Sequence, residues 1–130
     1  MVNIDKALGM SYVMDMEDLY QEILQVYLEE APQMKADIES SFATEDWDLY
    51  RTKVHALKST SLNIGASSFS EAAKECEYAC KRLAGEATEG YAADNDIPDA
   101  KEREVQFIKD RQAPLMELFD AVIAEARGMC

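Results

Sequence analysis

Apolar residues recur at intervals of three and four along most of the chain, which is the pattern of helices with one buried face. The pattern predicts a short helix over 3–10 and four long helices, over about 15–42, 45–63, 67–84 and 98–127. No segment alternates between apolar and polar residues in the way of a half-buried strand. The chain is therefore predicted to be all-α.

Four long amphipathic helices bury their apolar stripes best when they pack as an antiparallel, up-down four-helix bundle. The predicted connections at 43–45 and 64–67 are short, and short connections favour antiparallel neighbours. The additional N-terminal helix over 3–10 is too short to be stable alone, so we expect it to cap the bundle. Residues 1–130 are predicted to form a single domain, with 85–99 as a flexible acidic loop.

The second predicted helix begins in an acidic turn and is interrupted by a proline. Pro32 has no backbone N–H, so we expect it either to kink the helix or to split it into two segments. The expected buried positions recur at three and four residues: Leu19, Ile23, Val26 or Tyr27, Met34, Ile38 and Phe42.

Residues with strong capping preferences mark the helix ends near the middle of the chain. Thr44 is expected to be the N-cap of the third helix, because its hydroxyl can accept a hydrogen bond from a free backbone N–H. Gly65 is expected to end that helix, since glycine readily adopts the left-handed backbone conformation found there. Ser67 or Ser68 is expected to cap the following helix.

The third helix carries two distinct stripes on neighbouring faces. One is a seam expected to be buried and consists of Trp47, Tyr50, Val54, Leu57, Ser61 and Ile64. The other lies about 100° around the helix and consists of Arg51, His55, Lys58, Ser59 and Leu62. His55 is the only histidine in the chain. It should lie at the rim of the core, next to cations and within reach of another molecule.

Residues 55–66, His-Ala-Leu-Lys-Ser-Thr-Ser-Leu-Asn-Ile-Gly-Ala, resemble the phosphorylation-site motif of histidine-containing phosphotransfer (HPt) domains, roughly H-x-L-K-G-x-S-x-x-x-G-A. Six positions match, namely His55, Leu57, Lys58, Ser61, Gly65 and Ala66. Ser59 departs from the glycine that is usual there, although serine is also small enough for a partner to approach closely. The resemblance covers roughly residues 4–83 and, more loosely, the C-terminal helix. It implies the four-helix architecture already predicted.

The resemblance also implies that His55 takes a phosphoryl group from the aspartate of a receiver domain and passes it to another receiver. A neutral imidazole is a good nucleophile near neutral pH. Lys58 lies three residues further along the same face, so its ammonium can approach the phosphoryl oxygens. Arg51 could do the same or steer a partner. Ser59 and Leu62 would line the docking face.

No Gly-rich phosphate loop or other nucleotide-binding motif is present, so the chain is not expected to phosphorylate itself from ATP. We expect no cofactor on this chain, and Mg²⁺ would belong to the partner receiver domain. The expected partners are receiver domains of response regulators or of hybrid sensor kinases. One accessible active helix is enough for this role, so we expect a monomer.

The net charge of −13 is unevenly distributed. Residues 1–50 carry net −10, residues 51–84 net +3 and residues 85–130 net −6. An acidic body argues against nucleic acid as a partner, whereas the basic segment around His55 suits a phosphoryl group or an acidic pocket. No segment has the composition of a signal peptide or a membrane span, so we expect a cytoplasmic protein without membrane insertion.

Three cysteines do not form a disulfide framework, which also suits a reducing compartment. Cys76 and Cys80 are four residues apart on a predicted helix, and we interpret them as small buried hydrophobic residues. A zinc site would need a fourth ligand, and a redox pair would ordinarily have the Cys-x-x-Cys spacing.

Three alternatives to the phosphorelay hypothesis remain at this point. The chain could be a non-catalytic helical interaction bundle in which His55 is inactive or incidental. It could be a di-iron bundle, although such sites use paired Glu-x-x-His motifs and Thr52 stands three residues before His55. Within the family it could be a chemotaxis-kinase phosphotransfer domain, but the residues around Leu57 and Gly65 favour the relay type.

Overall fold

The computed structural model describes residues 3–86 and 100–130. In this part of the chain there are five helices and no strand, so the predicted all-α class is confirmed. The helices are α1 (Lys6–Ser11), α2 (Glu17–Ala43), α3 (Trp47–Asn63), α4 (Ser67–Leu83) and α5 (Ala100–Met129). Most of the loop predicted over 85–99 lies outside the described residues.

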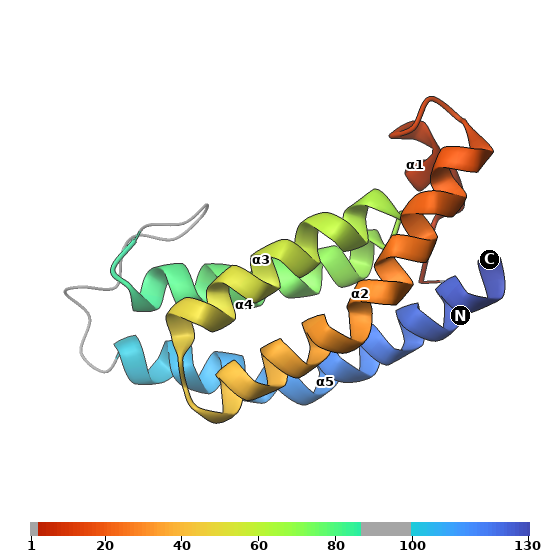
Figure 1. Cartoon of the computed structure of the whole chain (residues 1–130). Helices are drawn as coiled ribbons and strands as arrows, with labels where there is room; N and C mark the ends of the chain where they lie inside the picture. Colours follow the sequence, from red (N-terminus) through yellow and green to blue (C-terminus); the bar gives the residue numbers. More distant parts are fainter. Residues whose placement is uncertain (1–2, 87–99) are drawn as a thin grey trace.

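The four long helices alternate in direction along the chain, as in an up-down bundle (Figure 1). Each packs against its neighbours in sequence, and α2 also packs against α5, which closes the bundle. The short helix α1 packs against α2 and lies beyond the end of α3, where it covers that end of the bundle (Figure 1). None of the described helices is long and apolar enough to span a membrane.

The core is filled by large side chains from all four long helices, with Phe69 of α4 stacked on Phe119 of α5 at a centroid distance of 5.2 Å. Two buried tyrosines of α2 form hydrogen bonds with polar groups on or just after α3. Tyr20 donates to the Ile64 carbonyl at 2.7 Å, and Tyr27 is 2.9 Å from the Ser61 hydroxyl. Because a buried hydroxyl without a partner is costly, these hydrogen bonds help to fix how α2 packs against α3.

The apolar seam predicted for the first half of α2 is wrong at Leu19 and Ile23, and of the two alternatives Val26 and Tyr27 it is Tyr27 that is buried. The fully buried side chains there are Tyr20, Leu24, Tyr27 and Ala31, whereas Leu19, Ile23 and Val26 are exposed or half-buried. The buried set lies one position further along the helix. The three-four spacing fits both sets, so only packing against α3 and α5 selects between them. The uncovered apolar residues therefore form part of the protein surface.

Pro32 lies inside α2, and the helix continues through it, so the predicted split is wrong. The axis of α2 bends partway along its length (Figure 1), which agrees with the alternative prediction of a kink. Pro32 is exposed on the outer face of the bundle.

The predicted caps are partly wrong. Thr44 is the C-cap of α2, and the N-cap of α3 is Asp46, whose carboxylate accepts a hydrogen bond from the Leu49 amide at 3.2 Å. Neither serine caps α4: Ala66 holds the N-cap position without a side-chain hydrogen bond. Asp46 is the better cap because a carboxylate also compensates the partial positive charge of the helix N-terminus.

Gly65 ends α3 as predicted, in the left-handed region with φ of +93°. Its carbonyl accepts a hydrogen bond from the Asp5 amide at 2.9 Å, which ties the segment before α1 to the turn between α3 and α4. A Cβ atom at this position would lie 2.0 Å from the Asp5 carbonyl oxygen. The glycine is therefore required by both backbone conformation and space.

Replacing Gly65 by Ala should lower the free energy of unfolding by about 1–3 kcal/mol through backbone strain, with a further loss where Asp5 is displaced. Urea denaturation measures the change. Gly128→Ala is the matched control, because that Cβ would meet nothing within 4 Å and alanine favours a helix. Equal stability of the two variants would contradict this account of the turn.

Candidate functional site

The two stripes predicted on α3 are present. The predicted seam is fully buried from Tyr50 to Ile64, and Trp47, which precedes this stretch, is half-buried. On the neighbouring face, the side chain of His55 is 58% exposed. The reactive edge of an imidazole there is open to another molecule, while the backbone that carries it is fixed by the seam beneath.

His55 is oriented by a carboxylate from the next helix. Its Nδ1 lies 2.8 Å from Oε2 of Glu77 on α4, and the side chain of Glu77 is only 2% exposed. An ionised carboxylate can only accept a hydrogen bond, so Nδ1 of the neutral ring must carry the proton. The lone pair of the imidazole is then on Nε2, which is the nitrogen available for bond formation.

Two lysines balance the charge of Glu77. The ammonium of Lys58 is 2.7 Å from Oε1, and that of Lys81 is 3.5 Å from Oε2. The contact of Lys58 with Oε1 is an ion pair without good hydrogen-bond geometry, since this buried oxygen makes no directed hydrogen bond. This ion pair places the ammonium of Lys58 beside the His55–Glu77 pair.

The pKa of the Glu77 carboxyl reflects opposing effects. Burial acts to raise this pKa, but the contacts with Lys58 and His55 outweigh burial and leave it below its ordinary value. Glu77 therefore stays ionised at neutral pH and remains a hydrogen-bond acceptor for Nδ1. A neutral glutamic acid would not hold the ring in one tautomer as firmly.

Packing between α3 and α4 positions this carboxylate. Small or buried side chains of α4, among them Ala73, Cys76 and Cys80, face the core and allow the two helices to approach closely. The Ser70 hydroxyl donates to the Lys58 carbonyl at 2.8 Å, which fixes the register of α4 against the helix that bears His55. Cys76 and Cys80 are free thiols and behave as the buried hydrophobic residues that were predicted.

The residues expected to dock a partner differ in their exposure and in whether they are already paired. Ser59 is exposed and Leu62 is half-buried, so both are accessible one to two turns beyond the histidine. Arg51 is engaged elsewhere, in a bidentate ion pair with Glu86 just after α4. Its guanidinium would have to leave this carboxylate to reach a phosphoryl group.

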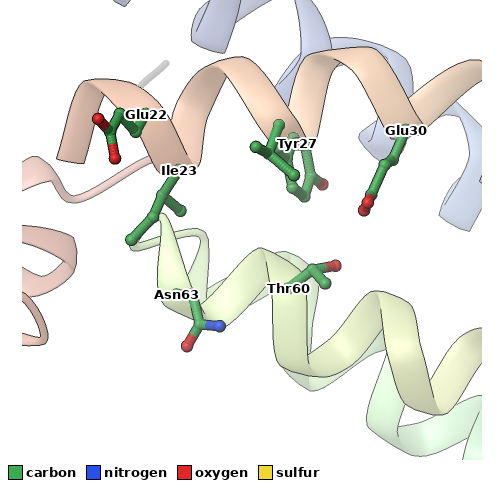
Figure 2. A pocket seen from close by; sticks show the side chains of 7 residues that line it. Glu22, Ile23, Tyr27, Glu30, Thr60 and Asn63 are labelled. Carbon is green, nitrogen blue, oxygen red and sulfur yellow. The ribbon is translucent and has the colours of Figure 1, made fainter. Parts of the chain in front are cut away.

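A groove, which we call the α2 groove, lies between α2 and α3 (Figure 2). Its volume is about 300 Å³, and its walls are mostly apolar with two carboxylates at the rim. Its lining consists of Glu22, Ile23, Val26, Tyr27, Glu30, Thr60 and Asn63. The side chain of Ile23 extends from α2 towards Asn63 at the far end of α3 (Figure 2). The groove thus extends the surface around His55 onto α2.

Glu77 contacts both His55 and Lys58 but was not predicted from the sequence. One signal could have identified it. Ala73, Glu77 and Cys80 follow one another at spacings of four and three, so the helical pattern places an acid within the buried face of α4. A buried acid requires a cationic or hydrogen-bonding partner. The basic segment around His55 could supply such a cationic partner.

No group of three histidine, cysteine, aspartate or glutamate side chains in the described residues is arranged to hold a metal ion. The fold and the site together define a helical bundle that presents one carboxylate-oriented histidine on a helix surface. A family model described as the Hpt domain matches residues 22–125, which is more than half of the chain. The chain therefore belongs to the Hpt domain family, as the motif predicted. Neither the curated proteins nor the solved structures gave a match.

Proposed function

We propose that His55 is the phosphoryl acceptor and donor of this chain and that it relays the group between two receiver aspartates. Membership of the Hpt family supports the proposal, because it implies histidine phosphotransfer in a phosphorelay and interaction with receiver domains. The observation that carries the proposal is the hydrogen bond from Nδ1 of an exposed histidine to buried Glu77. That bond leaves Nε2 unprotonated on the solvent side of α3.

In the forward step, Nε2 of His55 attacks the phosphorus of an aspartyl phosphate in the partner. The new N–P bond forms while the bond from phosphorus to the aspartate oxygen breaks, and the partner's carboxylate leaves. The ring then carries one positive charge, and Glu77 stabilises that charge through Nδ1–H. Attack by the aspartate of the next receiver reverses these bond changes and returns His55 to its neutral form.

The protein contributes alignment and charge stabilisation more than covalent chemistry, as in other phosphoryl transfers. Mg²⁺, in this proposal, is supplied by the receiver domain, and the chain itself carries no cofactor. Lys58 is the residue best placed to neutralise the transferring oxygens, since its ammonium already lies beside the His55–Glu77 pair.

Replacing Lys58 by Ala should slow phosphoryl transfer about 10- to 100-fold, which corresponds to the loss of one charge-assisted hydrogen bond from the ammonium to the transferring oxygens. The effect is expected in the rate at saturating partner, because the lysine acts on the transferring group. Single-turnover transfer from a phosphorylated receiver measures it. Lys53→Ala is the matched control, since this lysine of α3 pairs with Asp37 of α2 instead. Equal rates for the two variants would remove Lys58 from the mechanism.

We propose that the receiver docks over Ser59 and Leu62 and extends onto the groove between α2 and α3 (Figure 2). Arg51 would join this surface at its other end after exchanging Glu86 for a carboxylate of the partner. A monomer in the cytoplasm suits this arrangement, because a single face supplies every residue that the exchange requires.

The test is transfer of label from a panel of phosphorylated receiver domains to the chain, followed by a chase into a second, unlabelled receiver. We expect label on the chain that is lost in acid and survives alkali, as phosphohistidine does, and that leaves when the second receiver is added. Binding of receivers without any transfer of label would instead support the interaction bundle. Label that enters the chain but never leaves would contradict the relay.

A further inference from the structure

A cluster of lysines surrounds one tyrosine on the side of His55 opposite the α2 groove. The ammonium groups of Lys58, Lys74 and Lys81 lie 6.0, 5.3 and 4.8 Å from the centroid of the Tyr78 ring. All four residues belong to α3 or α4, and Lys81 and Lys58 also contact Glu77. We call this cluster the Tyr78 patch.

The Tyr78 patch carries a net positive charge. Glu77 compensates one of the three lysines, and Lys74 forms no ion pair within the described part of the chain. The tyrosine holds the lysine side chains over its ring, since cations are attracted to an aromatic face. The cations are therefore kept together beside His55 although like charges repel each other.

The surface on the opposite side of His55 carries negative charge. The α2 groove there is apolar, and its rim carries the carboxylates of Glu22 and Glu30. His55 thus has the cationic Tyr78 patch towards α4 on one flank and the apolar groove with its acidic rim towards α2 on the other. A partner that covers both flanks meets two surfaces of different chemistry, and one orientation satisfies both of them.

We propose that the Tyr78 patch receives the acidic mouth of the partner's phosphoaspartate pocket and thereby fixes the orientation in which the receiver docks. The inference rests on the proposed function, because it names the chemistry of the same partner. A pocket that binds Mg²⁺ and an aspartyl phosphate is built from carboxylates, which the three lysines complement. The remainder of the partner's contact surface then falls on the groove between α2 and α3.

A change at Lys74 can test the docking role separately from catalysis. It contacts Tyr78 but neither His55 nor Glu77 within the described residues, so its charge acts on docking alone. Long-range attraction between opposite charges raises the association rate and is screened by salt. A change at Lys74 should therefore alter the KM for the receiver, and the effect should shrink as ionic strength rises.

The experiment compares Lys74→Glu with Lys101→Glu, which makes the same charge change at an exposed position on α5. The receiver is the one from the panel that phosphorylates the wild type fastest. Lys74→Glu should lower kcat/KM about tenfold through KM at about 0.05 M salt, and less than about threefold at 0.5 M. Lys101→Glu should stay within about twofold of the wild type, because only a distant charge changes.

Phosphoramidate supplies a second readout that does not depend on docking. This small donor transfers its phosphoryl group to Nε2 of His55 as its P–N bond breaks and ammonia leaves. Its rate should be the same for the wild type and for Lys74→Glu. A slower reaction would place Lys74 at the histidine and overturn the docking role.

The remaining outcomes distinguish the two proposals. If both charge reversals affect receiver transfer equally, the Tyr78 patch has no special role, while the phosphorelay function stands. If the effect of Lys74→Glu falls on kcat alone or persists unchanged at high salt, steering by the patch is also overturned. If no receiver labels the wild type, the proposed function fails, and this inference fails with it.

Discussion

Replacing His55 by Gln is expected to abolish transfer of a phosphoryl group to the chain. Glutamine fills a similar volume but has no nucleophilic nitrogen, and transfer should fall by at least about 10³-fold because no other group takes over the covalent step. His55 is the only histidine in the 130-residue sequence. Acid-labile, alkali-stable label must therefore disappear entirely from the variant.

The same substitution should leave the fold intact. The side chain of His55 is 58% exposed and contributes nothing to the buried seam of α3. Helical circular dichroism and the midpoint of thermal unfolding, which change little for exposed substitutions, should stay close to wild type. Receiver binding by the folded variant should also persist. Phosphohistidine-like label on the His55→Gln protein would mean that the phosphoryl group is carried by another residue.

Replacing Glu77 by Ala is expected to slow transfer about 10- to 100-fold although this residue never touches the phosphoryl group, since an orienting carboxylate typically has effects of this size or larger. Without the carboxylate, Nδ1 and Nε2 compete for the proton, and part of the population presents a protonated Nε2. The developing positive charge on the ring also loses its counter-ion. Glu77→Gln should be less impaired, because the amide oxygen can still accept the hydrogen bond from Nδ1.

Nitrogen NMR of the His55 ring tests this role directly, because the shifts of Nδ1 and Nε2 show which atom carries the proton. The wild type should be almost entirely the Nδ1–H tautomer, and Glu77→Ala should be a mixture. If Glu77 only stabilised the fold, Glu77→Ala would lower the stability without changing the tautomer of His55. Wild-type shifts in a slowed Glu77→Ala protein would therefore contradict the positioning role.

Stability should depend on pH through the same carboxylate. The pKa of Glu77 is lowered in the folded protein, so its stabilising effect is fully present above the unfolded value of about 4.3. It is lost as the pH falls through the lower folded value. The difference in unfolding free energy between wild type and Glu77→Gln should thus shrink as the pH falls below about 4. A difference that grows in acid would contradict this sign.

Much of the fold follows from patterns along the chain. The three-four spacing placed the four long helices to within a few residues, and the positions of Pro32 and Gly65 marked a bend and an end that the structure shows. The seam of α3 was also predicted correctly, because its polar face is rich in charge and only one stripe remains for the core. These features are local, since they depend on residues within one or two helical turns.

The local pattern failed where two solutions satisfy it equally. The first half of α2 is apolar over a wide arc, and spacing alone could not show that Tyr20 and Leu24 are buried while Leu19 and Val26 remain outside. The hydroxyls of Tyr20 and Tyr27 favour burial of the observed face, because each forms a hydrogen bond with a buried partner on or just after α3. Thr44 is not the N-cap of α3 because α2 extends to Ala43 and takes Thr44 as its C-cap, so that Asp46 caps α3.

The helical bundle, and the place of His55 and Lys58 on the open face of the motif helix, can both be read from the sequence alone. The residue that orients this histidine cannot, because Glu77 follows it by 22 residues and reaches it through the packing of α4 on α3. The Tyr78 patch and the α2 groove likewise join residues from different helices. A periodic pattern shows which face of a helix is buried, but not which side chains of two helices meet, since that depends on the register between them.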